Sequence, residues 1–121
     1  MAQQPQRDRS AGELQIFKAQ FFRALAHPTR IRLLEHLVRG GRTVQELQEA
    51  LALSQPIVSQ QLAVLRNQGI VSAHKEGLAV RYVLRDPLVG ELLDLARRVF
   101  NNQLDNTRGL LRELRREGRR G

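Results

Sequence analysis

Residues 53–69 constrain the fold of this chain more than any other stretch, because they form a helical pattern with its own start and end signals. Ser54 is a good N-cap, since its hydroxyl can accept a hydrogen bond from an unpaired backbone N–H. Pro56 fits the first turn, where no N–H is needed, and Gly69 suits the left-handed end of a helix. The apolar stripe that would face a core consists of Val58, Leu62 and Leu65.

The other face of this helix is polar and uncharged. Gln55, Ser59 and Gln60 lie off the apolar stripe and carry amide and hydroxyl groups. Such groups can bond base edges and phosphates, so the face suits reading of a DNA major groove. An ordinary amphipathic helix with a solvated polar face is the alternative, and the neighbouring segments decide between the two.

Two helical patterns lead up to residues 53–69. Pro28 begins one helix, which continues to about residue 39 and ends at the glycines at 40–41. Thr43 and Glu46 have the spacing of a capping box and begin the other, over residues 43–50. A short turn at residues 51–53 joins this second helix to the one that begins at Ser54, and two short helices joined in this way predict a helix-turn-helix. The helix that begins at Pro28 is expected to direct four apolar side chains toward the core: Ile31, Leu34, Leu37 and Val38.

The hydrophobic period changes after Gly69. Apolar and polar residues alternate on both sides of a turn at Gly77 and Leu78, which predicts a β-hairpin. A hairpin directly after a helix-turn-helix is a wing. Lys75 and Arg81 would suit phosphate or minor-groove contacts, and a solvated hairpin is the equally weighted alternative.

The two ends of the chain carry bulky amphipathic helices. Residues 12–26 have a phenylalanine-rich stripe that must pack on the chain's own core or on a partner. The last helix, from the Asp-Pro pair at 86–87 to about residue 117, would be roughly 45 Å long at about 1.5 Å per residue, too long for a small domain to bury. The terminal helices therefore predict a homodimer, with an interface of Leu14, Phe17, Phe21, Leu92, Leu95 and Val99.

Composition limits the class of protein. The 121 residues suit one domain, and a net charge of +8 favours a polyanionic partner such as double-stranded DNA. The absence of cysteine excludes disulfides and thiolate metal ligands, and no stretch has the length of a membrane span or the form of a signal peptide, so we expect a cytoplasmic location. We divide the chain into a disordered arm (1–11), a winged-helix domain (12–117) and a basic tail (118–121).

Three segments resemble the ArsR/SmtB family of winged-helix transcriptional repressors, and the resemblance covers roughly residues 17–95. Residues 21–34 are similar to the family pattern ALa-x-x-tR-x-x-iL. Residues 53–66 resemble the family's DNA-reading helix, and residues 69–84 resemble its wing. The resemblance implies a mainly α-helical winged helix-turn-helix in which four helices, a small β-hairpin and a fifth helix follow one another.

The resemblance also implies how DNA would be bound. A homodimer would bind an imperfect palindrome, with its two reading helices about 34–36 Å apart. Thr43 would lie near a phosphate, and Gln60 stands where many relatives have histidine. By position, the residues that would face DNA are Ser54, Gln55, Pro56, Ser59, Gln60 and Gln61.

The family's usual metal sites are missing from this sequence. Thr43 and Gln45 occupy the positions of the paired cysteines, and the last helix has Asp94 and Asp105 but no histidine. The three histidines of the chain, which are weak candidates for a nickel or zinc effector site, are far apart: His27, His36 and His74. No cofactor is required, and a small molecule or a partner protein is at least as good a candidate effector.

We therefore predict a sequence-specific DNA-binding transcriptional regulator, a repressor, that acts as a homodimer. The sequence contains no GxSxG, P-loop or HExxH motif, so we expect no enzyme activity. A nonspecific DNA-coating protein or a protein-interaction module is the alternative, favoured by the charge and by the long terminal helices.

Overall fold

The computed structural model describes the backbone of residues 4–120 and the side chains of residues 12–118. The chain divides into two units, residues 1–87 and residues 88–121. The first unit contains α1 (Gln4–Leu25), α2 (Pro28–Leu37), β1 (Arg42–Thr43), α3 (Val44–Leu51), α4 (Gln55–Asn67), β2 (Val71–Glu76) and β3 (Ala79–Leu84), and the second is the single helix α5 (Leu88–Arg120).

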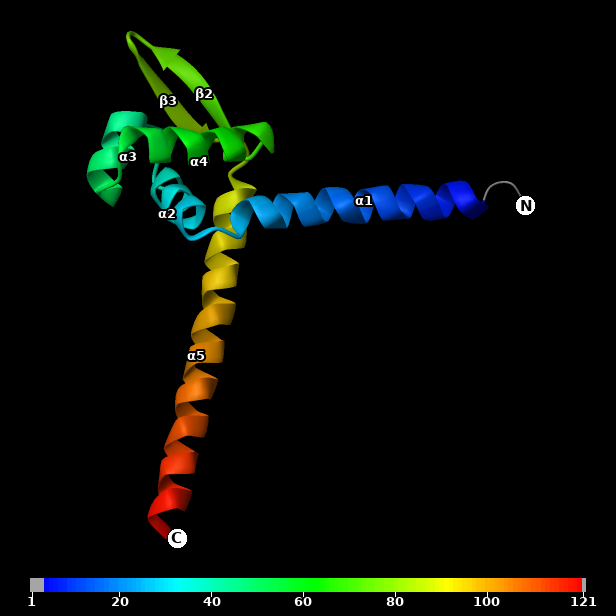
Figure 1. The fold of residues 1–121 in the computed structure, drawn as a ribbon, viewed down its shortest axis with the longest axis vertical. Coiled ribbons are helices and arrows are strands. Elements are labelled where there is room, and N and C mark those ends of the chain that lie inside the picture. The colour runs from blue at the N-terminus through cyan, green and yellow to red at the C-terminus, as the bar shows by residue number, and fades with distance from the viewer. Residues whose placement is uncertain (1–3, 121) are drawn as a thin grey trace. The chain divides into compact units, whose positions relative to one another are not determined.

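The core of the first unit is aliphatic. Leucine side chains of α2 and α3 pack with one face of α4 and with the start of β2, and the end of α1 closes the cluster (Figure 1). This arrangement buries one stripe of each short helix, as the predicted spacing requires. The fully buried side chains are Leu33, Leu34, Leu47, Val58, Leu62, Leu65, Ile70 and Val71.

The three strands form one antiparallel sheet in the order β1-β3-β2. The predicted hairpin is confirmed: β2 and β3 pair from Val71 with Leu84 to Glu76 with Ala79, on either side of Gly77 and Leu78. The very short β1 was not predicted, and it pairs with β3 through Thr43 and Arg81. The hairpin projects past α4 and forms the wing (Figure 1).

The first helix begins earlier than its stripe indicates. It starts at Gln4, whereas the sequence predicts a disordered arm over residues 1–11 and a helix from Gly12. Pro5 suits a first turn, and no proline follows before Pro28, so nothing in the sequence interrupts the helix. Residues 1–3 lie outside the described residues, and the division into domains stays a prediction.

One residue that the sequence predicts on the buried face of α2 is not buried. Val38 is 47% exposed, because it is the C-cap residue that follows the last turn of α2. Leu33, which lies one turn before Leu37, is fully buried instead. The helix therefore ends two residues before residue 39, where the sequence placed its end.

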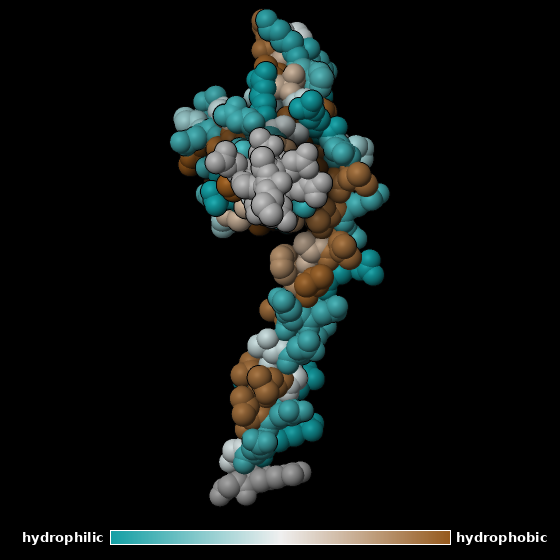
Figure 2. Space-filling model, turned by 90° about the vertical axis from the view of Figure 1, so that its right-hand side faces the viewer, coloured by the Kyte–Doolittle hydropathy of each residue, from teal (hydrophilic) through white to brown (hydrophobic). Residues whose placement is uncertain are grey.

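The helix α5 is amphipathic along its length. Leu95, Val99 and Phe100 in its first half, and Leu110 and Leu114 further on, are each about half exposed within the single chain. Figure 2 shows brown, hydrophobic patches along this helix. These described side chains of α5 are thus exposed in the single chain, as the sequence predicts.

Candidate nucleic-acid interface

The helix-turn-helix begins with a complete capping box at the start of α3. The Thr43 hydroxyl accepts a hydrogen bond from the Glu46 backbone N–H at 3.2 Å, and the Glu46 carboxylate accepts one from the Thr43 N–H at 3.2 Å. The helix ends at Ala52, whose left-handed conformation (φ 54°) turns the chain toward α4. The predicted capping box is thus confirmed, and it fixes where α3 starts.

Ser54 lies at the N-cap of α4 as predicted, but its hydroxyl makes no capping hydrogen bond. An N-cap side chain accepts from the second or third N–H of the helix; Pro56 at the second position has none, which leaves only that of Ile57. The predicted capping role of this hydroxyl is therefore wrong. The residue keeps the extended backbone (ψ 155°) of an N-cap and is exposed.

The two faces of α4 differ as the sequence predicts. Val58, Leu62 and Leu65 are fully buried, whereas Gln55, Pro56 and Gln60 are exposed and Ser59 is half-buried. The Gln55 amide donates a hydrogen bond to the Ser59 hydroxyl oxygen at 2.9 Å. This hydrogen bond fixes the Gln55 and Ser59 side chains relative to each other on the polar face of α4.

Gln61 is half-buried, unlike the exposed Gln60 beside it. Its side-chain oxygen accepts a hydrogen bond from Arg30 Nη1 at 2.9 Å. Arg30 also donates to the backbone oxygens of Ala24 and Arg23, at 2.5 and 3.3 Å. Gln61 therefore already takes part in a link between α2, α4 and the end of α1, and its role at DNA stays a prediction.

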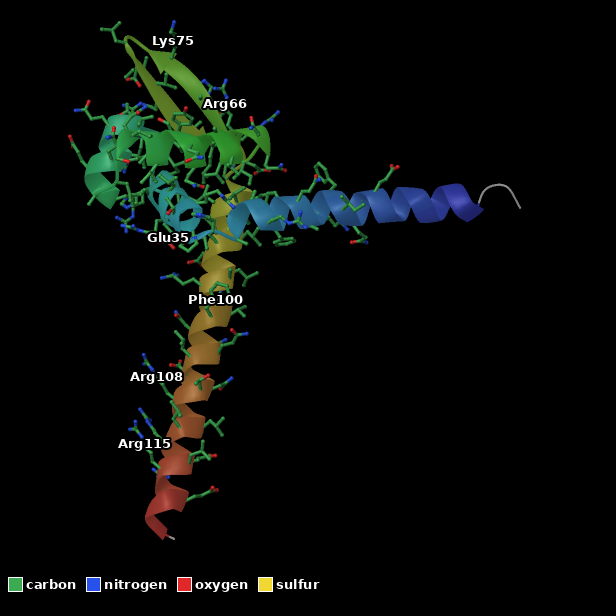
Figure 3. All side chains as sticks on the ribbon, viewed as in Figure 1. Glu35, Arg66, Lys75, Phe100, Arg108 and Arg115 are labelled. Atoms are coloured by element: carbon green, nitrogen blue, oxygen red, sulfur yellow. The ribbon has the colours of Figure 1, made fainter. Side chains whose placement is uncertain are left out.

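The wing presents one lysine to solvent. Lys75 lies opposite Val80, one pair from the end of the ladder, and is exposed (Figure 3). Gly77 has a positive φ of 63°, which the tight turn requires, and Leu78 beside it is fully exposed at the tip. Lys75 is thus accessible from solvent near the tip of the wing, and its contact with phosphate stays a prediction.

Arg81 is placed differently. Its Nε donates to a carboxylate oxygen of Glu76, its Nη1 donates to the Gly41 backbone oxygen at 2.8 Å, and its Nη2 lies 3.6 Å from Glu46 Oε1. The hydrogen bond to Glu76 raises the pKa of Arg81 above its ordinary value. The cation that the sequence assigns to DNA is thus engaged within the protein.

The electrostatics at the start of α3 favour ionised Glu46. Hydrogen bonds from the Thr43 backbone and side chain lower the pKa of Glu46, and the positive charges of Arg81 and Arg42 add to the effect. A carboxylate in the first turn also suits the positive end of the helix dipole. Glu46 is therefore a negative charge fixed beside the wing.

The histidines lie in separate places. His27 caps α2 by accepting a hydrogen bond from the Thr29 N–H at 3.1 Å, His74 Nε2 lies 3.1 Å from the Ser72 hydroxyl in β2, and His36 is half-buried in α2. Among residues 12–118, no three His, Asp or Glu side chains gather as a metal ion would need. A metal effector site stays a prediction.

The predicted dimer residues are accessible in the single chain. On α1, Leu14 and Phe17 are 51% and 69% exposed, and Phe21 packs edge-to-face on Phe22 with ring centroids 5.7 Å apart. On α5, the corresponding exposed or half-buried residues are Leu92, Leu95 and Val99.

Two features of the site were missed in the sequence. Ile57 is 43% exposed in the first turn of α4, beside the polar residues, and its place one residue before the stripe could have shown this. The partners of Arg81 were missed because Gly41 is 40 residues away in the chain. In the described part of the chain, no helix has the length and apolarity needed to cross a bilayer.

The sequence of this chain is similar to those of known bacterial regulatory proteins. Residues 27–73 match the sequence model of a family described as bacterial regulatory protein, arsR family. The chain is similar to the HTH-type transcriptional regulator Rv0081 of Mycobacterium tuberculosis, at 44% identity over 84% of this chain and 90% of that protein. It is also 49% identical, over 65% of this chain and 63% of that protein, to a probable mercury resistance operon repressor of Streptomyces lividans.

Solved structures show the same fold. The crystal structure of Rv0081 from M. tuberculosis superposes with a TM-score of 0.72 at 45% identity, over 77% of this chain and 94% of that chain. A solution structure of a homodimeric winged helix-turn-helix DNA-binding domain, Mb0332 from Mycobacterium bovis, superposes with a TM-score of 0.73 at 29% identity, over 82% of this chain and 91% of that one.

Proposed function

We propose that this chain, which belongs to the arsR family of bacterial regulatory proteins, represses transcription as a homodimer that binds an imperfect palindromic operator. It is a DNA-binding transcriptional regulator with a winged helix-turn-helix, like its relatives. The observation that supports operator reading best is the polar face of α4, where Gln55, Ser59 and Gln60 lie together directly after the turn of the helix-turn-helix.

In this proposal α4 is the recognition helix, and its side chains differ in task. Gln60 is exposed and can form the paired hydrogen bonds that an amide makes with adenine. The Ser59 hydroxyl accepts from Gln55, so its own O–H remains to be donated to a base acceptor. Pro56 holds the first turn, and Gln61 would contact DNA only with the part of its amide that Arg30 does not use.

Three further side chains would contact the backbone of DNA. The Ser54 hydroxyl makes no capping bond, and the Thr43 hydroxyl keeps its O–H after accepting from Glu46, so both can donate to phosphate. Lys75 supplies a positive charge from the wing. These contacts would set the register of α4 in the groove.

The homodimer is proposed to form through the exposed apolar residues of α1 and α5. Leu14 and Phe17 on one helix, and Leu95 and Val99 on the other, are each about half exposed or more in the single chain. Apolar stripes of this length are seldom left open to water, and a second copy of the chain covers them without any other partner. Two recognition helices about 34–36 Å apart would then match successive turns of DNA.

The proposed activity needs no cofactor, since side chains supply all the hydrogen bonds and charges, and its place is the cytoplasm, where bacterial DNA lies. A nickel or zinc ion, a small molecule or a co-regulator protein remains the candidate effector. The mercury named for the Streptomyces relative is not carried over, because mercury is a soft, thiolate-seeking metal and this sequence has no cysteine.

Selection of bound duplexes from a random DNA pool, with and without a panel of divalent metals, tests the proposal. We expect one short two-fold symmetric site, protected from cleavage in excess competitor DNA. A nonspecific DNA-coating protein would instead yield no enriched sequence. Its affinity would change with salt concentration and not with DNA sequence. That result would contradict operator recognition.

A further inference from the structure

Arg81 joins three segments that are distant in the sequence. It reaches the Gly41 backbone oxygen before β1, Glu46 in the first turn of α3, and Glu76 at the end of β2. Because Arg81 itself lies in β3, one guanidinium connects both strands of the wing to the start of the helix-turn-helix. Its planar group with several N–H donors can serve these acceptors together, which a lysine could not do.

The stem of Arg81 is also fixed. A Cβ built on Gly41 would lie 3.1 Å from both Cγ and Cδ of Arg81, so the arginine stem occupies the space in which a side chain at position 41 would lie. Thr43, two residues later, is paired with Arg81 in the sheet. The side chain therefore has little freedom to turn toward a DNA phosphate.

The charge of this cluster opposes phosphate binding. One guanidinium lies between two carboxylates, those of Glu46 and Glu76, so the three side chains carry a net negative formal charge. Lys75 on the neighbouring strand is exposed and lies opposite an apolar residue, Val80. Of the two wing cations that the sequence offers to DNA, the geometry favours Lys75.

We propose that Arg81 is a positioning residue: it holds the wing in a fixed orientation to α3 and α4 through Glu76, Glu46 and Gly41, and it does not contact DNA. This inference rests on the proposed function for its effect on operator binding. The orientation of the wing can be measured without DNA.

The first experiment follows the wing itself. The chain has no cysteine, so Leu78→Cys and Glu49→Cys, both at exposed positions, place two spin labels on the wing tip and on α3. Dilution with unlabelled protein limits the measured distances to one chain. We expect a narrow distance distribution that broadens in Arg81→Gln and in Glu76→Gln, and that stays narrow in the matched control Lys75→Gln.

The second experiment measures binding to the selected operator duplex at several salt concentrations. Glu76→Gln removes a negative charge near DNA, which alone would raise affinity. We expect the opposite, a loss of about tenfold, the usual scale for coupling through a positioning contact. Arg81→Gln should lose as much affinity, with no change in the slope of log affinity against log salt concentration. The double variant should lose no more affinity than either single variant. Lys75→Gln should make the slope shallower by about 0.9 for each phosphate that the lysine neutralises in wild type, or about 1.8 in a dimer.

Two results would overturn the inference. One is an unchanged distance distribution in folded Arg81→Gln and Glu76→Gln proteins. The other is a shallower salt slope in Arg81→Gln together with tighter binding in Glu76→Gln, which would identify Arg81 as a phosphate contact. If wild-type protein selects no duplex, the proposed function fails, and the distance measurement still decides the role of Arg81.

Discussion

Arg30 Nη1 donates a hydrogen bond to the side-chain oxygen of Gln61 at 2.9 Å, and this bond joins α2 to α4. The same guanidinium caps the end of α1 through the backbone oxygens of Ala24 and Arg23. One arginine therefore links three helices of the first unit.

Replacement of this arginine should destabilise the fold. We expect Arg30→Lys to lower the free energy of unfolding by about 1–2 kcal/mol, because one ammonium cannot replace the fork of donors. Arg32→Lys is the matched control, since Arg32 makes one longer bond, 3.3 Å, to the Leu51 oxygen. Urea unfolding at fixed protein concentration measures both, and equal losses would contradict the role given to Arg30.

Truncation of the polar face of α4 should weaken operator binding and leave the fold intact. Gln60→Ala should cost about 1–3 kcal/mol of binding free energy, the value of one paired base contact. Ser59→Ala should also weaken binding, because it removes a hydroxyl and the partner of the Gln55 amide. The control is Gln68→Ala, an exposed amide at the other end of α4. Unchanged affinity in both test variants would argue against groove reading by this face.

Two glycine substitutions should change stability in opposite directions. A Cβ at Gly41 would lie 2.9 Å from Val83 Cγ1, so Gly41→Ala should lower the free energy of unfolding by about 1–3 kcal/mol. Gly109 lies within α5 with nothing within 4 Å of such a Cβ, and Gly109→Ala should raise it by about 1 kcal/mol through helix propensity. Thermal unfolding at one protein concentration compares them. An unchanged or raised stability in Gly41→Ala would refute the crowding at position 41.

The capping box should make stability depend on acid pH. The pKa of Glu46 in the folded chain is lowered below its ordinary value of 4.5, so its stabilising effect is complete above that pH and disappears as the pH falls through the folded-state pKa. Glu46→Gln keeps an acceptor for the Thr43 N–H and removes the charge. We expect the variant to be less stable than wild type at pH 7 and equally stable in strong acid. A stability difference that does not change with pH would contradict this assignment.

The chain should be a dimer at micromolar concentration. Phe17→Asp places a charge in an exposed apolar stripe and should weaken dimerisation by more than about 2 kcal/mol. Leu78→Asp is the control, since Leu78 is fully exposed at the tip of the wing, outside the proposed interface. Light scattering should report a monomer for the first and a dimer for the second. A monomeric wild type would remove the basis for palindrome recognition.

The parts of the fold that were predictable depend on local signals. Pro28 begins α2, Thr43 and Glu46 cap α3, and Gly77 turns the wing, and each of these acts within a few residues of its own position. The buried stripe of α4 was likewise evident from its spacing.

The parts that were not predictable depend on contacts between distant segments or on one backbone group. The strand β1 exists only because it pairs with β3. The engagement of Arg81 depends on Gly41 and Glu46, which the sequence places far away. At the start of α4, Pro56 removes one of the two backbone N–H groups that the Ser54 hydroxyl could cap, and the hydroxyl makes no capping bond.

That missing bond leaves position 54 unusually free to vary. Because the Ser54 side chain contributes no cap, its replacement should cost the fold little, and any residue that tolerates the extended backbone can occupy the edge of the recognition surface. Thr43 has no such freedom, since its hydroxyl belongs to a capping box. A library randomised at position 54 can therefore be searched for altered operator affinity while thermal stability stays nearly constant, which makes this position a convenient place to begin redesign.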